Sequence, residues 1–296
     1  MNSLTDKINI KSKIHLSIRK DYQNHAFISG NKLRKLEYNL AQAQLEKQTQ
    51  LLTFGGAYSN HIAAVAYAGN EYNFNTIGII RGEELNHHIN ENPTLSFAKK
   101  QGMQFKFISR AAYKEKTAPL FIDHLKKEFG DFYLLPEGGT NDLAVKGCEE
   151  ILTKKDAIYD YICCPVGTGG TIAGIINASF PHQKIIGFPA LKGDFLKDEI
   201  RKFAQQSNWE LIQDYHFGGY AKVNTDLIAF MNQFKTENNI PLDPVYTGKM
   251  MFGIYDLISK GFFPENAKIL AIHTGGLQGI SGMNIVLKKR GLPLIQ

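Results

Sequence analysis

A short apolar run enters a glycine-rich turn in Tyr161-Ile162-Cys163-Cys164-Pro165-Val166-Gly167-Thr168-Gly169-Gly170-Thr171, and an apolar helix pattern follows it. A run of this length that ends at glycine is typical of a strand buried on both faces. Three other glycine pairs follow short apolar runs in the same way: Gly55-Gly56, Gly138-Gly139 and Gly275-Gly276. Strands that alternate with helices predict right-handed βαβ units and mostly parallel sheets, so the fold class is α/β.

The alternation runs through most of the 296 residues. We expect strands over residues 51–54, 76–80, 105–108, 132–135, 161–165, 185–188 and 268–272, with weaker strand signals at 8–10, 14–18 and 209–213. Helices are expected over 93–100, 117–129, 141–154, 194–206, 224–237 and 249–260, and a last one ends near 289. The chain is long enough for two α/β domains. We expect residues 1–37 and 141–296 to form the larger domain and residues 38–140 a smaller inserted one.

The loop Gly167–Thr171 has the chemistry of a phosphate cradle. Consecutive glycines expose backbone N–H groups, the next helix adds its positive end, and Thr168 and Thr171 add hydroxyls. The dinucleotide pattern G-x-G-x-x-G fails because residue 172 is Ile, and no Gly-Lys-Ser/Thr ending marks a nucleotide-triphosphate loop. A phosphate monoester fits this loop; the alternative is a simple tight turn between a strand and a helix.

Lys32 directly follows a Gly-Asn turn signal and precedes leucines at helical spacing. With Asn31 as the helix cap, the lysine falls in the first turn, where the helix dipole disfavours a cation. Such an ammonium is either solvated on the surface or chemically used. Together with a phosphate cradle it suggests pyridoxal 5′-phosphate, whose aldehyde condenses with a lysine amine and whose ring accepts electrons.

Composition excludes several classes of protein. Hydrophobic residues make up 43% and charged residues 21%, which is ordinary for a globular protein. The net charge of +6 is spread along the chain, so we expect neither a nucleic-acid partner nor a membrane span, and the charge suits a small anionic ligand. Three cysteines without a secretory signal favour a cytoplasmic protein. His87-His88 lacks metal-ligand spacing, so no metal site is expected.

Six segments in order resemble the D-cysteine desulfhydrase and 1-aminocyclopropane-1-carboxylate deaminase family, within the tryptophan synthase β-subunit-like pyridoxal phosphate enzymes. They are Ser29–Tyr38, Gly56–His61, Pro136–Gly139, Gly167–Thr171, Val245–Lys249 and His273–Gly276. The resemblance covers nearly the whole chain. It implies the two-domain fold of that superfamily (type II), each domain a mostly parallel open twisted sheet flanked by helices, with the cofactor between them. It also implies a homodimer.

The resemblance assigns roles residue by residue. Lys32 forms the Schiff base and removes the Cα proton, Ser59 contacts the substrate carboxylate, and Asn60 bonds the cofactor's phenolic oxygen and the substrate. His61 is expected to line the substrate pocket. Residues Gly167, Thr168, Gly169, Gly170 and Thr171 hold the phosphate. Tyr220 and Tyr246 match the family's active-site tyrosines, with Tyr246 near the ring.

Two threonines discriminate within the family. Thr247 and Thr274 stand where the deaminases typically carry Glu and Leu, and a carboxylate at the ring nitrogen would strengthen the electron sink. Threonines at these positions imply that the cofactor ring is a weaker electron sink. A weaker sink suits the elimination of a good leaving group. The sequence therefore predicts a lyase of amino-acid metabolism that acts on a small amino acid, with D-cysteine as substrate. The alternatives are 1-aminocyclopropane-1-carboxylate deamination, serine or threonine dehydration, β-replacement, or a silent phosphate-ligand binding protein.

Overall fold

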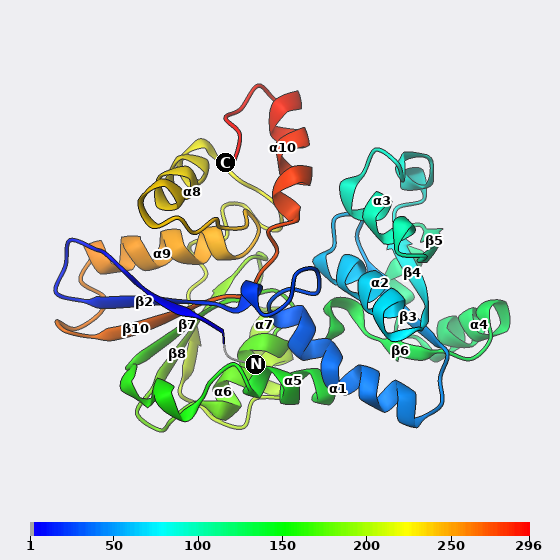
Figure 1. Cartoon of the computed structure of the whole chain (residues 1–296), viewed down its shortest axis with the longest axis horizontal. Coiled ribbons are helices and arrows are strands. Elements are labelled where there is room, and N and C mark those ends of the chain that lie inside the picture. The colour runs from blue at the N-terminus through cyan, green and yellow to red at the C-terminus, as the bar shows by residue number, and fades with distance from the viewer. Residues whose placement is uncertain (1–2) are drawn as a thin grey trace.

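The computed structural model describes residues 3–296, which form two sheets side by side (Figure 1). The larger sheet has six strands in the order β1 (Thr5–Ile8), β2 (His15–Lys20), β10 (Lys268–His273), β7 (Tyr161–Val166), β8 (Lys184–Pro189) and β9 (Trp209–Leu211). Only β1 runs antiparallel to its neighbour; every other pair is parallel. The predicted α/β class with mostly parallel sheets is confirmed.

The smaller sheet has four parallel strands in the order β5 (Gln104–Ile108), β4 (Asn75–Arg81), β3 (Gln50–Gly55) and β6 (Tyr133–Leu135). All four strands come from the segment 38–140. The exact division of the chain into 1–37 with 141–296 and an inserted 38–140 stays a prediction.

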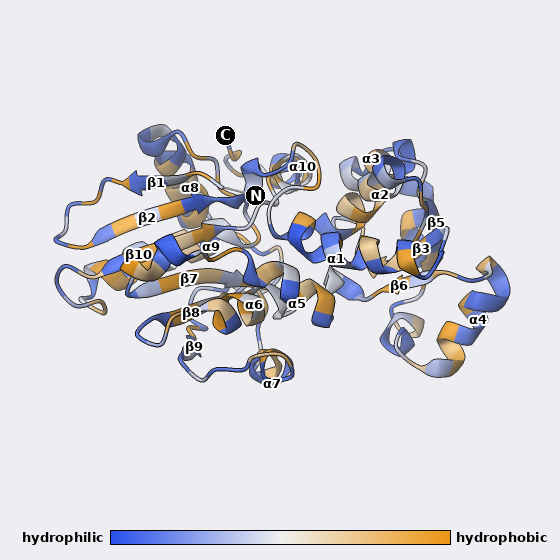
Figure 2. Cartoon of the chain, turned by 60° about the horizontal axis from the view of Figure 1, so that its bottom comes forward, coloured by the Kyte–Doolittle hydropathy of each residue, from blue (hydrophilic) through white to orange (hydrophobic). Residues whose placement is uncertain are grey.

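Helices cover both faces of both sheets (Figure 1). Their bounds are α1 (Asn31–Leu45), α2 (Asn60–Tyr72), α3 (Pro93–Lys100), α4 (Pro119–Phe129), α5 (Asp142–Glu149), α6 (Gly170–Ala178), α7 (Phe195–Arg201), α8 (Thr225–Asn238), α9 (Thr247–Ser259) and α10 (Gly279–Lys289). In Figure 2 the apolar residues gather on the strands and on the helix faces toward them.

The strand β7 shows why its sequence is a continuous apolar run. Cys163 belongs to the core under α8 and α9, whereas its neighbour Cys164 belongs to the core under α6 and α7. Successive side chains of a strand point to opposite faces, and here both faces are covered. Both cysteines are fully buried and free, as core residues.

Two predicted helices are shorter than expected. The helix predicted over 141–154 ends at Glu149, because Thr153 starts a separate 3-10 helix, Lys154–Ile158, through a capping box with Asp156. The helix predicted over 194–206 ends at Arg201. Among residues 3–296, no helix combines the length and apolarity needed to cross a bilayer.

The helix α1 joins the two sheets. It lies between them in Figure 1 and packs against α5 on one side and α2 on the other. Its N-terminus contacts the loops that follow β10 and β7 of the larger sheet, through Thr274 and Thr171. The loop that follows β3 of the smaller sheet lines the same pocket, so carboxyl ends of strands from both sheets meet near it. Ligands of open parallel sheets collect at such edges.

Candidate active site

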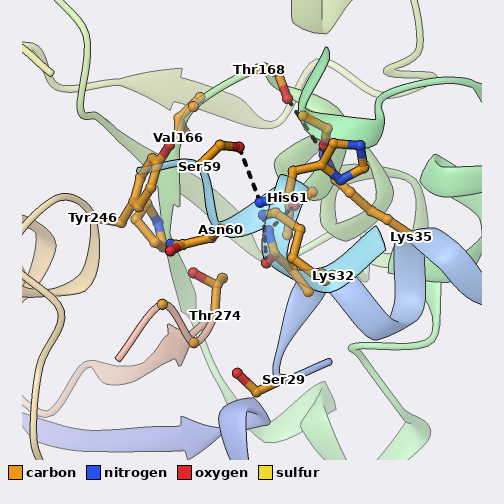
Figure 3. A pocket seen from close by; sticks show the side chains of 18 of the residues that line it. Ser29, Lys32, Lys35, Ser59, Asn60, His61, Val166, Thr168, Tyr246 and Thr274 are labelled. Atoms are coloured by element: carbon orange, nitrogen blue, oxygen red, sulfur yellow. Dashed lines mark hydrogen bonds between the residues drawn. The ribbon is translucent and has the colours of Figure 1, made fainter. Parts of the chain in front are cut away.

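One pocket lies where these loops meet. Its walls come from the start of α1, the loop from β3 into α2, the loops after β7 and β10, and the segments that carry Tyr220 and Tyr246. Figure 3 shows the side chains of Lys32, Lys35, Ser59, Asn60, His61, Tyr246 and Thr274 gathered around it. Among the residues to which the sequence analysis gave a binding or catalytic role, Gly170 is absent from the lining, because it lies behind the cradle against Lys35 and Thr140.

Lys32 is the second residue of α1 and projects into the pocket (Figure 3). Burial, reinforced by the nearby charge of Lys35, lowers the pKa of its amine to about 7. An amine with this pKa is largely unprotonated just above neutral pH, which is the form that attacks a carbonyl carbon or takes up a proton. The alternative, that Lys32 is a solvated surface lysine, is wrong, because the residue is half-buried and lines the pocket.

Contrary to the prediction, Asn31 does not cap the helix. The capping position is Gly30, and Asn31 is already the first helical residue. Its side chain instead bridges the pocket: Oδ1 accepts a hydrogen bond from Lys32 Nζ at 3.1 Å, and Nδ2 donates to Thr171 Oγ1 at 2.8 Å. Asn31 therefore ties the amine to the glycine loop.

Gly30 fixes the start of α1 against the loop after β10. Its φ is +65°, and a Cβ there would lie 2.0 Å from the carbonyl oxygen of Thr274. The N–H of Asn31 donates to the same oxygen at 3.2 Å. Only glycine permits this approach, and the position of Lys32 depends on it.

The loop Gly167–Thr171 forms an anion cradle. Gly169 has a φ of +89°, α6 begins at Gly170, and the first amides of a helix have no partner within it. Lys35 adds a cation that the sequence analysis missed: its Nζ donates to Gly138 O at 3.0 Å and to Thr140 Oγ1 at 2.9 Å, and lies 3.5 Å from Thr168 Oγ1. Lys35 lies three residues after Lys32, on the same helix face, and this spacing could have revealed it.

Ser59 and Asn60 begin α2. The Ser59 hydroxyl caps the helix by accepting from the N–H groups of His61 and Ile62, at 3.2 and 3.3 Å. Asn60 Oδ1 accepts from Nε2 of Gln278 at 3.0 Å, a residue that the sequence analysis did not single out. This contact occupies the amide oxygen of Asn60 and leaves its NH2 group free to donate to another partner.

His61 lines the pocket but is buried, with 1% of its surface exposed. Thr53 donates its hydroxyl proton to Leu135 O, so His61 Nε2 must donate to Thr53 Oγ1, at 2.9 Å. Its Nδ1 has no hydrogen-bond partner among residues 3–296. Burial and the positive charges of Lys32 and Lys35 hold the pKa of His61 well below its ordinary value, so the ring is neutral.

Tyr220 and Tyr246 both line the pocket and pack edge to face against each other. Their ring centroids are 6.2 Å apart and the rings are tilted by 69°. Burial raises the pKa of Tyr246 well above its ordinary value, so its hydroxyl keeps its proton and can donate it. A Cβ on Gly167 would lie 3.1 Å from the ring of Tyr246, so the glycine loop and the ring pack closely.

Thr247 and Thr274, the two threonines used to discriminate within the family, differ in their position relative to the pocket. Thr274 lines the pocket. Thr247 does not line it: its hydroxyl donates to Asp243 Oδ2 at 2.7 Å, and the residue is fully buried. The interpretation that Thr247 faces a ring nitrogen is therefore wrong, because the turn at Asp243 points this side chain away.

The lining of this pocket contains two lysines and no Asp or Glu. The residues fit a phosphate-bearing carbonyl cofactor: a glycine loop with a cation for the phosphate, a half-buried amine of lowered pKa for the carbonyl, and hydroxyl and amide donors around them. This donor set defines an α/β protein that binds an anionic cofactor at the junction of two sheets.

Comparison with known proteins gives the family. A family model described as a pyridoxal-phosphate dependent enzyme matches residues 3–275. The chain belongs to this family, and its cofactor is pyridoxal phosphate. Its relatives are lyases that use this cofactor.

Three relatives indicate where the chain stands within the family. A protein of Pyrococcus horikoshii, provisionally named a 1-aminocyclopropane-1-carboxylate deaminase, is 31% identical over 88% of this chain and 84% of its own length. The bifunctional D-cysteine desulfhydrase/1-aminocyclopropane-1-carboxylate deaminase, mitochondrial, of Arabidopsis thaliana is 31% identical over 90% of this chain and 73% of its own. A crystal structure described as an ACC deaminase homologue superimposes with a TM-score of 0.84 at 27% identity, covering 98% of this chain and 94% of its own.

Proposed function

We propose that this protein catalyses α,β-elimination from a small amino acid, with D-cysteine as the preferred substrate and pyruvate, sulfide and ammonia as products. The overall change is D-cysteine plus water to these three products. The observation that carries the proposal is the pocket lining, in which two lysines and two tyrosines surround the cofactor site and no carboxylate is present.

Pyridoxal phosphate supplies an aldehyde that condenses with the substrate amine and a ring that draws electrons away from Cα. The cradle of Gly167–Thr171 with Lys35 would bind the phosphate, and the amide NH2 of Asn60 would donate to the phenolic oxygen. These residues would orient the bound cofactor toward Lys32.

Lys32 removes the Cα proton. Its lowered pKa suits this task, because a base works best when its pKa lies near the working pH. Ser59 and the N-terminus of α2 bind the substrate carboxylate, as a helix start favours anions. His61 shapes the pocket beside them.

Tyr220 and Tyr246 act at the other end of the substrate. A neutral tyrosine hydroxyl can donate a hydrogen bond or a proton to the departing sulfur, and the raised pKa of Tyr246 keeps that proton available. Without a carboxylate to keep the ring nitrogen protonated, the ring is a weaker electron sink. A good leaving group such as thiolate needs less help from the ring than the opening of a cyclopropane does.

The second candidate is deamination of 1-aminocyclopropane-1-carboxylate, which the names of the relatives favour. The same scaffold would also serve dehydration of serine or threonine, or β-replacement. The non-enzymatic alternative is a catalytically inactive protein that binds a phosphate-containing ligand.

One assay distinguishes the proposed function from these alternatives. The purified protein is given D-cysteine, L-cysteine, D-serine, L-serine, L-threonine and 1-aminocyclopropane-1-carboxylate in turn, and sulfide, the 2-oxo acid and ammonia are measured. The proposal expects equal amounts of all three products from D-cysteine. Turnover of 1-aminocyclopropane-1-carboxylate alone, to ammonia and 2-oxobutanoate, would contradict the proposal. No turnover of any substrate would favour the catalytically inactive binding protein.

We also propose that the protein is a cytoplasmic homodimer. The three buried, free cysteines support a reducing compartment, and the family resemblance supports the dimer. A mass of one chain by light scattering would contradict the dimer. Localisation of the tagged protein outside the cytoplasm would contradict the compartment.

A further inference from the structure

Lys249 is a buried cation outside the pocket lining. It lies in the first turn of α9, and 1% of its surface is exposed. Its Nζ donates to two backbone carbonyls, those of His216 and Gly219, at 2.8 Å each. Burying an ammonium is costly unless it is well hydrogen-bonded, so these two contacts are strong ones.

Both carbonyls belong to the loop that carries Tyr220. Four of its residues have left-handed φ values: Phe217 (+53°), Gly218 (+91°), Gly219 (+116°) and Ala221 (+55°). Such values are uncommon and strained for Phe and Ala, so the loop needs contacts from outside to keep this conformation. Lys249 supplies two of them, one on each side of Phe217-Gly218.

The same helix start carries the other tyrosine. Tyr246 lies three residues before Lys249 and immediately before α9, and its ring centroid lies 6.2 Å from that of Tyr220. The backbone that holds Tyr246 is itself fixed, because Asp243 accepts hydrogen bonds from the N–H groups of Val245, Tyr246 and Thr247. One rigid turn thus carries Tyr246 and the cation that binds the Tyr220 loop.

We propose that Lys249 is a positioning residue that holds Tyr220 at its working distance from Tyr246. The role assigned to the tyrosines rests on the proposed function; the clamp itself rests on the contacts above. Lys249 is not among the residues that line the pocket, so it acts through the loop.

The clamp depends on charge. Burial lowers the pKa of Lys249 to about 8, and the negative charge of Asp243 opposes that lowering. On the loop side, the ammonium contacts the two carbonyls, one of which belongs to His216. The half-buried ring of His216 accepts at Nδ1 from the N–H of Gly218. As pH rises above 8 the ammonium loses its proton, its hydrogen bonds weaken, and the loop loosens.

The test uses the full-length protein loaded with cofactor and compares Lys249→Met with Lys260→Met. The control lysine lies at the other end of α9, is exposed, and pairs with Asp256. We expect Lys249→Met to speed amide hydrogen exchange in residues 216–221 by about tenfold or more, with the control unchanged. We expect kcat to fall by about tenfold or more while cofactor affinity stays within about twofold.

Unchanged exchange in residues 216–221, or a loss of activity explained by loss of cofactor alone, would overturn the clamp. Hydrogen exchange needs no substrate, so it decides the clamp even if D-cysteine is not turned over, in which case only the proposed function fails. If Lys249→Met does not fold, Lys249→Arg decides: it stays charged, so the loosening of the loop between pH 7 and 9 should disappear. Identical pH dependence in Lys249→Arg and the unmodified protein would refute the proposal.

Discussion

Gln278 and Asn60 join across the cleft between the two sheets: Gln278 Nε2 donates to Asn60 Oδ1 at 3.0 Å. Gln278 follows β10 of the larger sheet, and Asn60 begins α2 behind the smaller one. Because the amide oxygen of Asn60 is occupied, its NH2 group is available to the pocket. Gln278 therefore decides which end of the Asn60 amide meets the cofactor.

Gln278→Ala should weaken cofactor binding by about three- to tenfold, the effect of one lost hydrogen bond that orients another group. Gln278→Glu should be worse than Gln278→Ala, because a carboxylate accepts only and would draw the NH2 of Asn60 away from the pocket. Titration of the cofactor-free protein with pyridoxal phosphate measures both. Equal affinity of the Ala and Glu variants would show that Gln278 does not orient Asn60.

Gly30→Ala should displace the start of α1 and weaken cofactor binding by about tenfold or more, since the new Cβ would overlap the Thr274 carbonyl. The matched control is Gly291→Ala. Gly291 has the same φ of +65°, but a Cβ there meets nothing within 4 Å.

Both substitutions carry the strain of a left-handed alanine, of roughly 1 kcal/mol. Chemical denaturation measures that shared cost, and cofactor titration measures the rest. If Gly30→Ala binds cofactor as well as Gly291→Ala does, the contact with Thr274 does not place Lys32.

Lys32 should destabilise the cofactor-free protein at low pH. Its pKa is about 7 in the fold and about 10.4 in an unfolded chain, so between these values the unfolded state binds more protons. Stability therefore rises with pH across this window, and the full cost of the buried charge applies below pH 7.

We expect Lys32→Met to be more stable than the unmodified cofactor-free protein by about 2–4 kcal/mol at pH 6, with the difference shrinking toward pH 10. Urea denaturation at several pH values checks this. A difference that is independent of pH would mean that Lys32 keeps its ordinary pKa.

Asp21 and Arg34 form a buried ion pair that supports α1. Arg34 is 2% exposed and Asp21 0%, and Nε and Nη2 of Arg34 donate to the carboxylate at 2.7–3.1 Å. Removing one partner leaves a buried charge, so Arg34→Leu should lower the free energy of unfolding by about 3–5 kcal/mol.

The exposed pair of Lys13 and Glu265 is the control, and Lys13→Leu should change the free energy of unfolding by less than about 1 kcal/mol. Thermal and urea denaturation of both variants give the comparison. Similar values for the two would mean that the buried pair does not hold α1 in place.

The alternation of strands, glycine loops and helices was predictable because it depends on local pattern. The run 161–166 is apolar at every strand position after Tyr161, and glycine marks its end. Helix ends were less predictable: the end of α5 at Glu149 depends on the capping box of Thr153 with Asp156, and Asp156 is held by Arg19 from a distant strand.

Within the pocket, the glycine loop and Lys32 were predictable, whereas side-chain directions were not. Thr247 turns away because Asp243, four residues earlier, binds it. Asn31 serves as a bridge and not as a cap because the contact of Gly30 with Thr274 moves the helix start by one residue. Gln278 could not be found from sequence, since its partner Asn60 lies 218 residues away.

The central claim is that Lys32 carries the cofactor, and the pocket offers a direct rival in Lys35, the other lysine of its lining. The measurement is reduction of the cofactor-loaded protein with borohydride, followed by mass spectrometry of its peptides. Our account predicts that the pyridoxyl label is fixed to Lys32, that it is absent from Lys32→Ala, and that Lys35→Met is still labelled at Lys32. A label on Lys35, or undiminished labelling of Lys32→Ala, would contradict it.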